Sequence, residues 1–219
     1  MKYIYMFLGG ILSLFGLHNV IMLEVESDNQ GNTVAVFKEL LRRGWNKRYR
    51  IVLITNDPKS LVYCRAKHVS IVKRVQFGDN WASLMRMRWL FLRASIIIDE
   101  NKQIRKRDPR TIHIYLSHGS PVKRTHDYYN CLPDTDYALC QSEFWRTIES
   151  FQLIIPEEKL VIKGFPRNDA LFSSRVFKTA LLEDDYKKVV VWYPTFRQHK
   201  IECNARTTDS AALPIIHNE

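Results

Sequence analysis

The chain has 219 residues, 46% of them hydrophobic, and a formal net charge of +10. This apolar content excludes a disordered chain, and the length allows one domain plus part of another. The positive charge favours an anionic partner, which could be nucleic acid, a phosphorylated substrate or an acidic membrane surface.

Residues 1–18 form an apolar leader. Its run YIYMFLGGILSLFGL is shorter than the roughly 20 residues that span a bilayer. It has no small-x-small cleavage site and lacks the cationic face of an interfacial helix. We expect a membrane-associating or hydrophobically packed leader, and a signal anchor and a cleaved signal peptide are the other two interpretations.

From residue 19 onward, strand-like and helix-like stretches alternate. Apolar runs predict buried strands, and 3.6-residue periodicity between them predicts helices. The expected strands are 19–25, 50–55, 69–75, 95–99, 111–116, 137–140, 159–164 and 188–194, and the expected helices are 32–44, 80–94, 141–151 and 168–182. This alternation with doubly apolar strands predicts an α/β fold with a parallel sheet covered on both faces.

Local signals refine three of these helices. Asn32 is a candidate N-cap for the helix at 32–44, and Ser142 for the helix at 141–151. In the helix at 80–94, we expect Trp81, Leu84, Met85 and Leu92 to face the core.

The segment IYLSHGSPVKR places His118 directly after a strand, where ligands bind in parallel sheets. A histidine accepts a proton near neutral pH, and Gly119 permits close backbone approach. Lys123 and Arg124 could neutralise phosphate charge. The alternative interpretation is a surface loop with solvated cations, and the same alternatives apply to the basic stretch at 102–110.

Two further turns follow predicted strands. In KGFPRND, Arg167 could hold an oxyanion, while Asn168 or Asp169 could bind substrate or simply cap the next helix. In YPTFR, Thr195 and Arg197 lie past a strand end, and a turn with a solvent-facing arginine is the alternative.

Several classes of site are disfavoured by the absence of their motifs. The four cysteines have no CxxC spacing, and the histidines lack the i, i+4 spacing of a helical metal pair. There is no GxGxxG, Walker A or GxSxG motif, and no pattern typical of nucleic-acid binding. We therefore expect no metal, no cofactor and no nucleic-acid partner.

Six motifs together resemble one known family. VESDNQGNTVAVFKEL, IVLITNDP, YLSHGSPVKR, ALCQSEFWRTIESF, VIKGFPRNDALF and VVVWYPTFR occur in the order expected of the CDP-glycerol glycerophosphotransferases, the teichoic-acid primases and polymerases. The resemblance runs from about residue 20 to about residue 197.

The resemblance implies a GT-B fold, in which two Rossmann-like domains face each other across a cleft. Residues 19–184 would form the N-terminal, acceptor-side domain, and residues 185–219 the beginning of a donor-side domain that continues further in the family. Without that remainder, we expect weak or no turnover. The implied partners are CDP-glycerol or a similar CDP-alcohol, a lipid-linked acceptor and the anionic cytoplasmic face of the cell membrane.

The family's His-Gly-Thr-Pro motif matches residues 118–121, with Ser120 in place of threonine. The resemblance therefore implies that His118 is the catalytic base and that Ser120 orients the acceptor. The residue before the histidine, usually tryptophan, is Ser117 here. Phosphate contacts are expected from the other strand-end residues, namely Gly119, Lys123, Arg124, Arg167, Asn168, Asp169, Thr195 and Arg197.

Three other functions compete with this interpretation. The chain could be a GT-B glycosyltransferase that uses a nucleotide sugar, a non-catalytic acceptor- or membrane-binding module, or a nucleic-acid binder.

Overall fold

The computed structural model describes residues 2–25, 31–59, 61, 66–74, 80–100, 106–117, 119 and 134–172. The chain divides into two compact units, residues 1–174 and 175–219. The second unit lies outside the described residues, as does the strand expected at 188–194. The expected domain boundary after residue 184 therefore stays a prediction.

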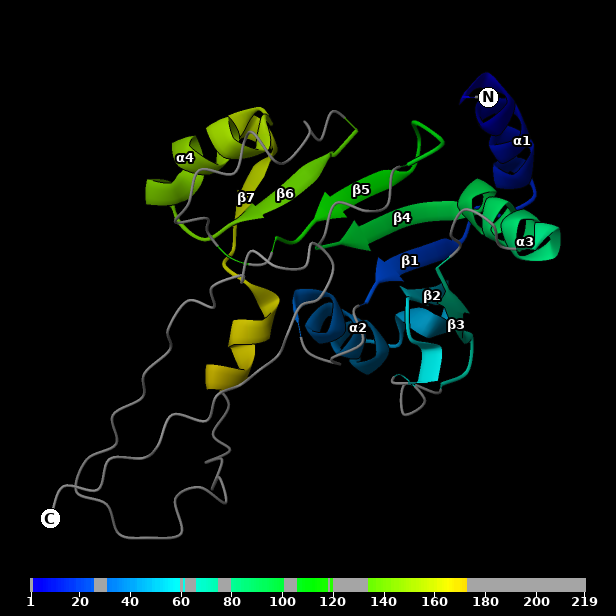
Figure 1. Cartoon of the computed structure of the whole chain (residues 1–219), viewed down its shortest axis with the longest axis horizontal. Coiled ribbons are helices and arrows are strands. Elements are labelled where there is room, and N and C mark those ends of the chain that lie inside the picture. Colours follow the sequence, from blue (N-terminus) through cyan, green and yellow to red (C-terminus); the bar gives the residue numbers. More distant parts are fainter. Residues whose placement is uncertain are drawn as a thin grey trace, which may run out of the picture. The chain divides into compact units, whose positions relative to one another are not determined.

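The described part of the first unit contains a parallel sheet (Figure 1). Its strands are β1 (Val20–Glu24), β2 (Arg50–Thr55), β3 (Val69–Lys73), β4 (Ala94–Asp99), β5 (Ile112–Tyr115), β6 (Tyr137–Cys140) and β7 (Leu160–Ile162). Their order in space is β3-β2-β1-β4-β5-β6-β7, with every neighbouring pair parallel. This is the doubly wound order of a Rossmann-like domain, and it confirms the predicted α/β fold class.

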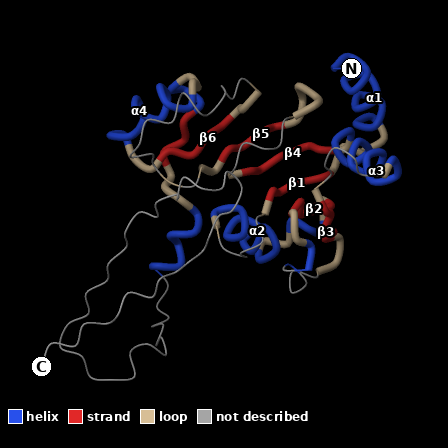
Figure 2. The backbone as a smooth tube through the Cα atoms, in the orientation of Figure 1, coloured by secondary structure: helices blue, strands red, loops and turns tan. Residues whose placement is uncertain are grey.

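Most of the α-helices connect successive strands in the sequence and pack on the faces of the sheet (Figure 2). The α-helices are α1 (Lys2–Leu14), α2 (Asn32–Arg42), α3 (Trp81–Leu92) and α4 (Glu143–Leu153). Short 3-10 helices are η1 (Trp45–Lys47), η3 (Glu157–Lys159) and η4 (Pro166–Phe172). The prediction of an α-helix at 168–182 is wrong for residues 168–172, because they belong to η4, which begins at Pro166 and has 3-10 geometry.

Alternate side chains of the strands build two cores on opposite faces of the sheet. Ile21, Leu23, Ile51 and Leu53 pack with the α2 residues Val34 and Phe37 on one face. Val20, Met22, Val52 and Ile54 pack with the α3 residues Met87 and Leu90 on the other. Strands buried on both faces in this way explain why they read as continuous apolar runs.

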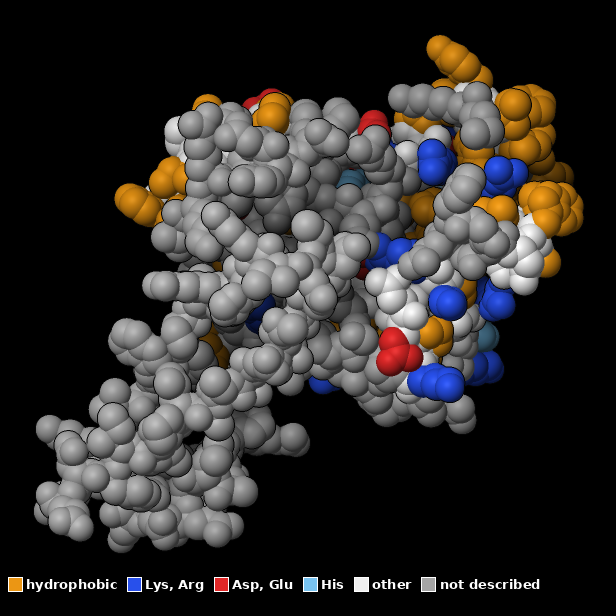
Figure 3. Space-filling model, in the orientation of Figure 1, with side chains coloured by type: hydrophobic (Ala, Val, Ile, Leu, Met, Phe, Trp, Pro, Cys, Tyr) orange, Lys and Arg blue, Asp and Glu red, His pale blue; other side chains and the backbone are white. Residues whose placement is uncertain are grey.

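The predicted inner face of α3 is wrong. Met87 and Leu90 are its buried residues, whereas Trp81 and Met85 are exposed, at 73% and 39%. The helix is apolar around much of its circumference, so periodicity alone did not choose the face that packs on the sheet. Trp81, Met85 and Trp89 instead contribute to an apolar surface that α3 shares with α1 (Figure 3).

The apolar leader is helical. The 13 residues of α1 measure on the order of 20 Å along the axis, and no described helix is long and apolar enough to cross a bilayer. Its side chains Tyr3, Ile4, Phe7 and Leu14 are largely exposed.

The fold predicts that two ion pairs contribute very differently to the free energy of unfolding. Arg74 bonds the carboxylate of Glu24, whose side chain is 1% exposed, whereas Arg42 and its partner Glu39 lie on the surface of α2. Breaking a buried ion pair by removing one partner is strongly destabilising, so we expect Arg74→Ala to lower the free energy of unfolding by about 3–5 kcal/mol. Arg42→Ala should change it little, because water screens an exposed pair.

Urea denaturation of the two variants measures this difference. Equal midpoints for Arg74→Ala and the parent protein would show that Glu24 does not depend on this arginine.

Candidate functional site

The carboxyl edge of the sheet brings together segments that are far apart in the sequence. Asn32 follows β1, Ser117 follows β5 and Arg167 follows β7. The side chain of Asn32 donates from Nδ2 to the carbonyl oxygen of Ser117 at 2.7 Å, and its Oδ1 accepts from the backbone N–H of Arg167 at 3.2 Å. The two predicted strand-end turns therefore belong to one local site.

The N-terminus of α2 is capped from another strand. The backbone N–H groups of Asn32 and Thr33 both donate to Oε2 of Glu100, at 2.8 and 3.3 Å. Gly31 occupies the N-cap position with φ 128°, and a Cβ there would lie 2.5 Å from Oε1 of Glu100. The prediction that Asn32 caps this helix is wrong, because Asn32 is its first residue and Glu100 supplies the oxygen.

The turn after β5 has an unusual backbone. Ser117 is buried and has a left-handed φ of 59°, which is uncommon for a residue with a side chain. Its hydroxyl donates to the carbonyl oxygen of Gly119 at 3.1 Å, and Gly119 has φ 153°. His118 and Ser120 lie outside the described residues, so their proposed roles stay predictions.

The turn after β7 lies beside this backbone. A Cβ built on Gly119 would be 3.8 Å from Nη2 of Arg167, which places the guanidinium next to the turn that contains the predicted base. An arginine here can hold phosphate oxygens through paired N–H donors. Arg167 is exposed, so it is accessible to a ligand.

Asn168 and Asp169 lie within η4 rather than at the N-cap of an α-helix. The backbone N–H of Asn168 donates to the carbonyl oxygen of Phe165 at 2.9 Å. The remaining predicted contacts lie outside the described residues, namely Lys123, Arg124, Thr195 and Arg197.

A row of buried polar side chains lies inside the sheet near the same edge. Leu23 pairs with Ile98, so the next residues, Glu24 and Asp99, end neighbouring strands, and both are fully buried. Oδ2 of Asp99 lies 3.2 Å from Nε2 of His113, a distance within ion-pair range but without hydrogen-bond alignment.

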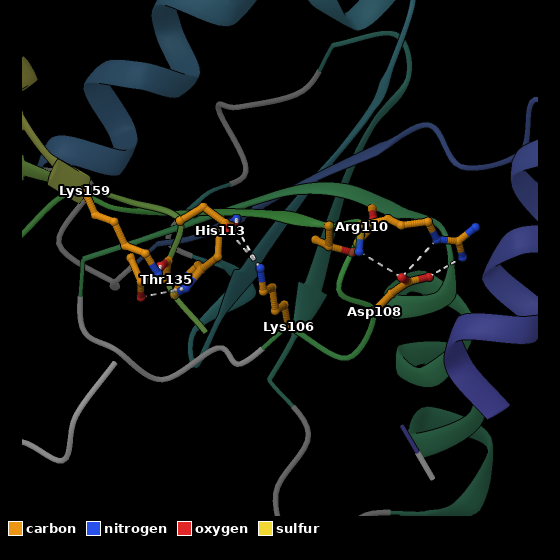
Figure 4. Close-up of polar contacts among 9 residues, drawn as sticks. Lys106, Asp108, Arg110, His113, Thr135 and Lys159 are labelled. Carbon is orange, nitrogen blue, oxygen red and sulfur yellow. Dashed lines mark hydrogen bonds and ion pairs between the residues drawn. The ribbon is translucent and has the colours of Figure 1, made fainter. Parts of the chain in front are cut away.

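His113 connects this row to the start of β6. Its Nδ1 lies 3.1 Å from Oγ1 of Thr135, and its backbone N–H donates to Asp136 at 2.8 Å (Figure 4). Sequence reasoning missed Glu24 and Asp99, although a carboxylate at the end of an apolar run was a visible signal. Their burial and mutual position indicate a structural role beneath the site.

In the described part of the basic stretch at 102–110, carboxylates pair with two of the cations. Lys106 pairs with Asp136 at 2.8 Å, and Arg110 pairs with Asp108 at 2.5 Å (Figure 4). Burial by itself would raise the pKa of Asp108, but hydrogen bonds from Arg110 outweigh it and lower that pKa. Both cations therefore have carboxylate partners within the fold.

The described part of the chain shows neither an accessible cysteine thiol nor a set of metal ligands. Cys140 is buried in the core between β6 and α4, and burial raises the pKa of its thiol. The described residues contain no group of three or more histidine, cysteine or acidic side chains that could hold a metal ion.

Comparison with known proteins agrees with this architecture. The chain is similar to the wall teichoic acid polymerase TagF, with 16% identity and a TM-score of 0.55 over 71% of this chain and 40% of that chain. It is also similar to a TagF variant soaked with CDPG for 15 minutes, with 14% identity and a TM-score of 0.57 over 75% and 46% of the two chains. At these identities the likeness establishes the fold, and the chain spans less than half the length of these TagF chains.

Sequence comparison assigns the family. No curated protein matches the chain. A family model described as CDP-Glycerol:Poly(glycerophosphate) glycerophosphotransferase matches residues 12–215. Because this match covers nearly the whole sequence, the protein belongs to the CDP-glycerol glycerophosphotransferase family.

Proposed function

We propose that the protein takes part in teichoic-acid or capsule-type polymer synthesis by transferring glycerol phosphate, or a related polyol phosphate, from a CDP-activated donor to a membrane-linked acceptor. The family match over residues 12–215 carries this proposal. The convergence of the Ser117–Gly119 turn and Arg167 at the sheet's carboxyl edge supports it, since ligands bind there in doubly wound folds.

In the proposed reaction, His118 is the general base. A hydroxyl of the acceptor attacks the β-phosphorus of CDP-glycerol, and His118 takes the hydroxyl proton. A new P–O bond forms while the bond from the β-phosphorus to the bridging oxygen breaks, and CMP leaves with that electron pair. A positioned base contributes roughly 10²–10⁴-fold to such a step.

Cations at the strand ends would stabilise the charge on the transferred phosphoryl group. Arg167 is the described candidate, because its guanidinium lies next to Gly119. Arg197, Lys123 and Arg124 would act in the same way, with Thr195, Asn168 and Asp169 as further polar contacts. Ser120 would orient the acceptor hydroxyl. Electrostatic stabilisation and positioning of this kind supply most of the rate enhancement in phosphoryl transfer.

We also propose that α1 and α3 place the protein on the cytoplasmic face of the membrane. Gly9 of α1 is buried against Arg110, whose Nη2 donates to the carbonyl oxygen of Met6 at 3.0 Å. The helix is therefore attached through its backbone, while Phe7 remains 70% exposed. A core helix would show the opposite arrangement, with its apolar side chains inward.

The neighbouring helix extends the same surface. Trp81, Met85, Arg88 and Trp89 recur at the spacing of one helical face, and all four are exposed. Helices α1 and α3 contact each other, and apolar and basic side chains gather over them (Figure 3). Exposed aromatic residues with an arginine fit a lipid surface that carries anionic headgroups.

One test of the proposed function concerns the base. In a full-length version that includes a donor-side domain, His118→Ala should abolish CMP release from CDP-glycerol in the presence of a lipid that ends in glycerol phosphate, while the circular dichroism spectrum stays that of the parent. Parallel incubation with UDP-sugars tests the glycosyltransferase alternative through release of UDP. Turnover of His118→Ala within a few-fold of the parent would refute its role as base.

An inactive parent chain would be informative as well. Turnover that appears only when a donor-side domain is supplied separately would show that the reaction needs that domain. Vesicle binding without turnover, even after that addition, would favour a non-catalytic module.

Another prediction concerns the proposed membrane surface. Phe7→Asp should lower co-flotation with vesicles of phosphatidylglycerol and phosphatidylcholine by roughly tenfold or more, because a buried phenylalanine contributes about 1.5–3 kcal/mol. Phe144→Asp is the matched control, since Phe144 on α4 is 74% exposed. Arg88→Ala should weaken binding to anionic vesicles but not to neutral ones.

Equal flotation of Phe7→Asp and Phe144→Asp would contradict the assignment of this face to the membrane.

A further inference from the structure

One asparagine connects the two turns of the candidate site. Asn32 is fully buried, and its amide uses both ends: Nδ2 donates to Ser117 and Oδ1 accepts from Arg167. These partners are 85 and 135 residues away in the sequence. Because both contacts are to backbone atoms, Asn32 holds the main chain of the two turns rather than one side-chain rotamer.

The backbone of Asn32 is held by a third segment. The backbone N–H of Asn32 donates to Glu100, which is 5% exposed and follows the neighbouring strand β4. The close approach of Glu100 depends on Gly31, where a side chain would collide with the carboxylate. Asn32 is thus tied to segments that follow three other strands, β4, β5 and β7.

The Ser117 backbone needs such support. Its left-handed φ of 59° costs of order 1–3 kcal/mol and persists only where the surrounding structure holds it. The bond from Asn32 fixes the carbonyl group of Ser117, which is part of the peptide bond to residue 118. The same side chain fixes the backbone at Arg167, whose guanidinium reaches toward Gly119.

We propose that Asn32 is a positioning residue that sets the distance between the turn after β5 and the turn of Arg167. This inference rests on the proposed function, in which those turns hold the base and a phosphate-binding cation. Asn32 itself is buried and acts through Ser117 and Arg167 rather than on the substrate. Only a side chain with a donor and an acceptor can make both bonds.

The experiment compares three variants of the full chain. Asn32→Leu removes both bonds at similar volume. Asn32→Asp keeps an acceptor for Arg167 but, as a carboxylate, has no donor for Ser117. Asn46→Asp is the matched control, because Nδ2 of Asn46 also donates to a backbone carbonyl, that of Lys67 at 3.0 Å. That bond lies before β2 and β3, at the opposite edge of the sheet.

Kinetics of CMP release give the functional result. A misplacement of about 1 Å can cost 10²-fold, so we expect kcat per folded molecule to fall roughly 100-fold in both Asn32 variants, with KM for CDP-glycerol within about threefold of the parent. Asn46→Asp should keep the parent's kcat and KM. A purely structural role for Asn32 would reduce the amount of folded protein and leave kcat per folded molecule unchanged, and that result would overturn the proposal.

A measurement by nuclear magnetic resonance separates this inference from the proposed function. Asn32→Leu should speed amide hydrogen exchange at Arg167 by roughly tenfold or more, since the donor loses its buried acceptor. Asn32→Asp should preserve that protection but shift the carbonyl carbon resonance of Ser117. If the parent releases no CMP even with a donor-side domain supplied, the proposed function fails, whereas unchanged exchange at Arg167 in Asn32→Leu would overturn the role of Asn32 whatever the reaction.

Discussion

The parallel hydrogen bonding of the sheet is the constraint on which the candidate site depends. When neighbouring strands run in the same direction, every segment that leaves a carboxyl end emerges at the same edge. Residues 32, 100, 117 and 167 become neighbours for this reason alone. The doubly wound order also places β1 and β4 side by side at the point where the chain changes direction across the sheet. In the proposed function, this edge is where a base and a cation from distant motifs act on one phosphate.

Because the polar groups at this edge are buried, they favour one arrangement of the turns over others. A buried amide or carboxylate that loses its partner costs 1–3 kcal/mol or more. Asn32, Glu100 and Asp99 therefore stabilise this arrangement of turns over alternatives in which they would be unsatisfied. Two further pairs lie inside the sheet and act in the same way: Glu24 with Arg74, and Asp99 with His113. We infer that the row supports the edge mechanically, while the accessible chemistry belongs to the strand-end turns above it.

The proposed membrane-facing surface follows a different principle. In α1, the backbone at Gly9 and Met6 contacts the loop of Arg110, and the apolar side chains point away from the domain. In α3, two buried residues suffice to attach the helix to the sheet, which leaves its tryptophans outside. The proposed reaction edge and the proposed lipid surface are thus built from separate elements: the turns after β5 and β7, and the helices α1 and α3.

The sequence by itself determined the strands, most helices and the family. Apolar runs bounded by polar turns located β1 to β7, and the signal is strongest in β1 and β2, which are buried on both faces and so carry apolar side chains at nearly every position. Six ordered motifs identified the family and nominated residues 118 and 167. These signals are local: each can be read within a dozen residues.

Only the tertiary structure decided which distant groups meet. The sequence presented Asn32 as a helix cap, but the fold gave the capping role to Glu100 and left the Asn32 amide to bridge two turns. It presented Trp81 and Met85 as core residues, but contact with the sheet selected Met87 and Leu90. In both cases the outcome depends on a partner from another strand or face, and local periodicity and capping preferences contain no information about that partner.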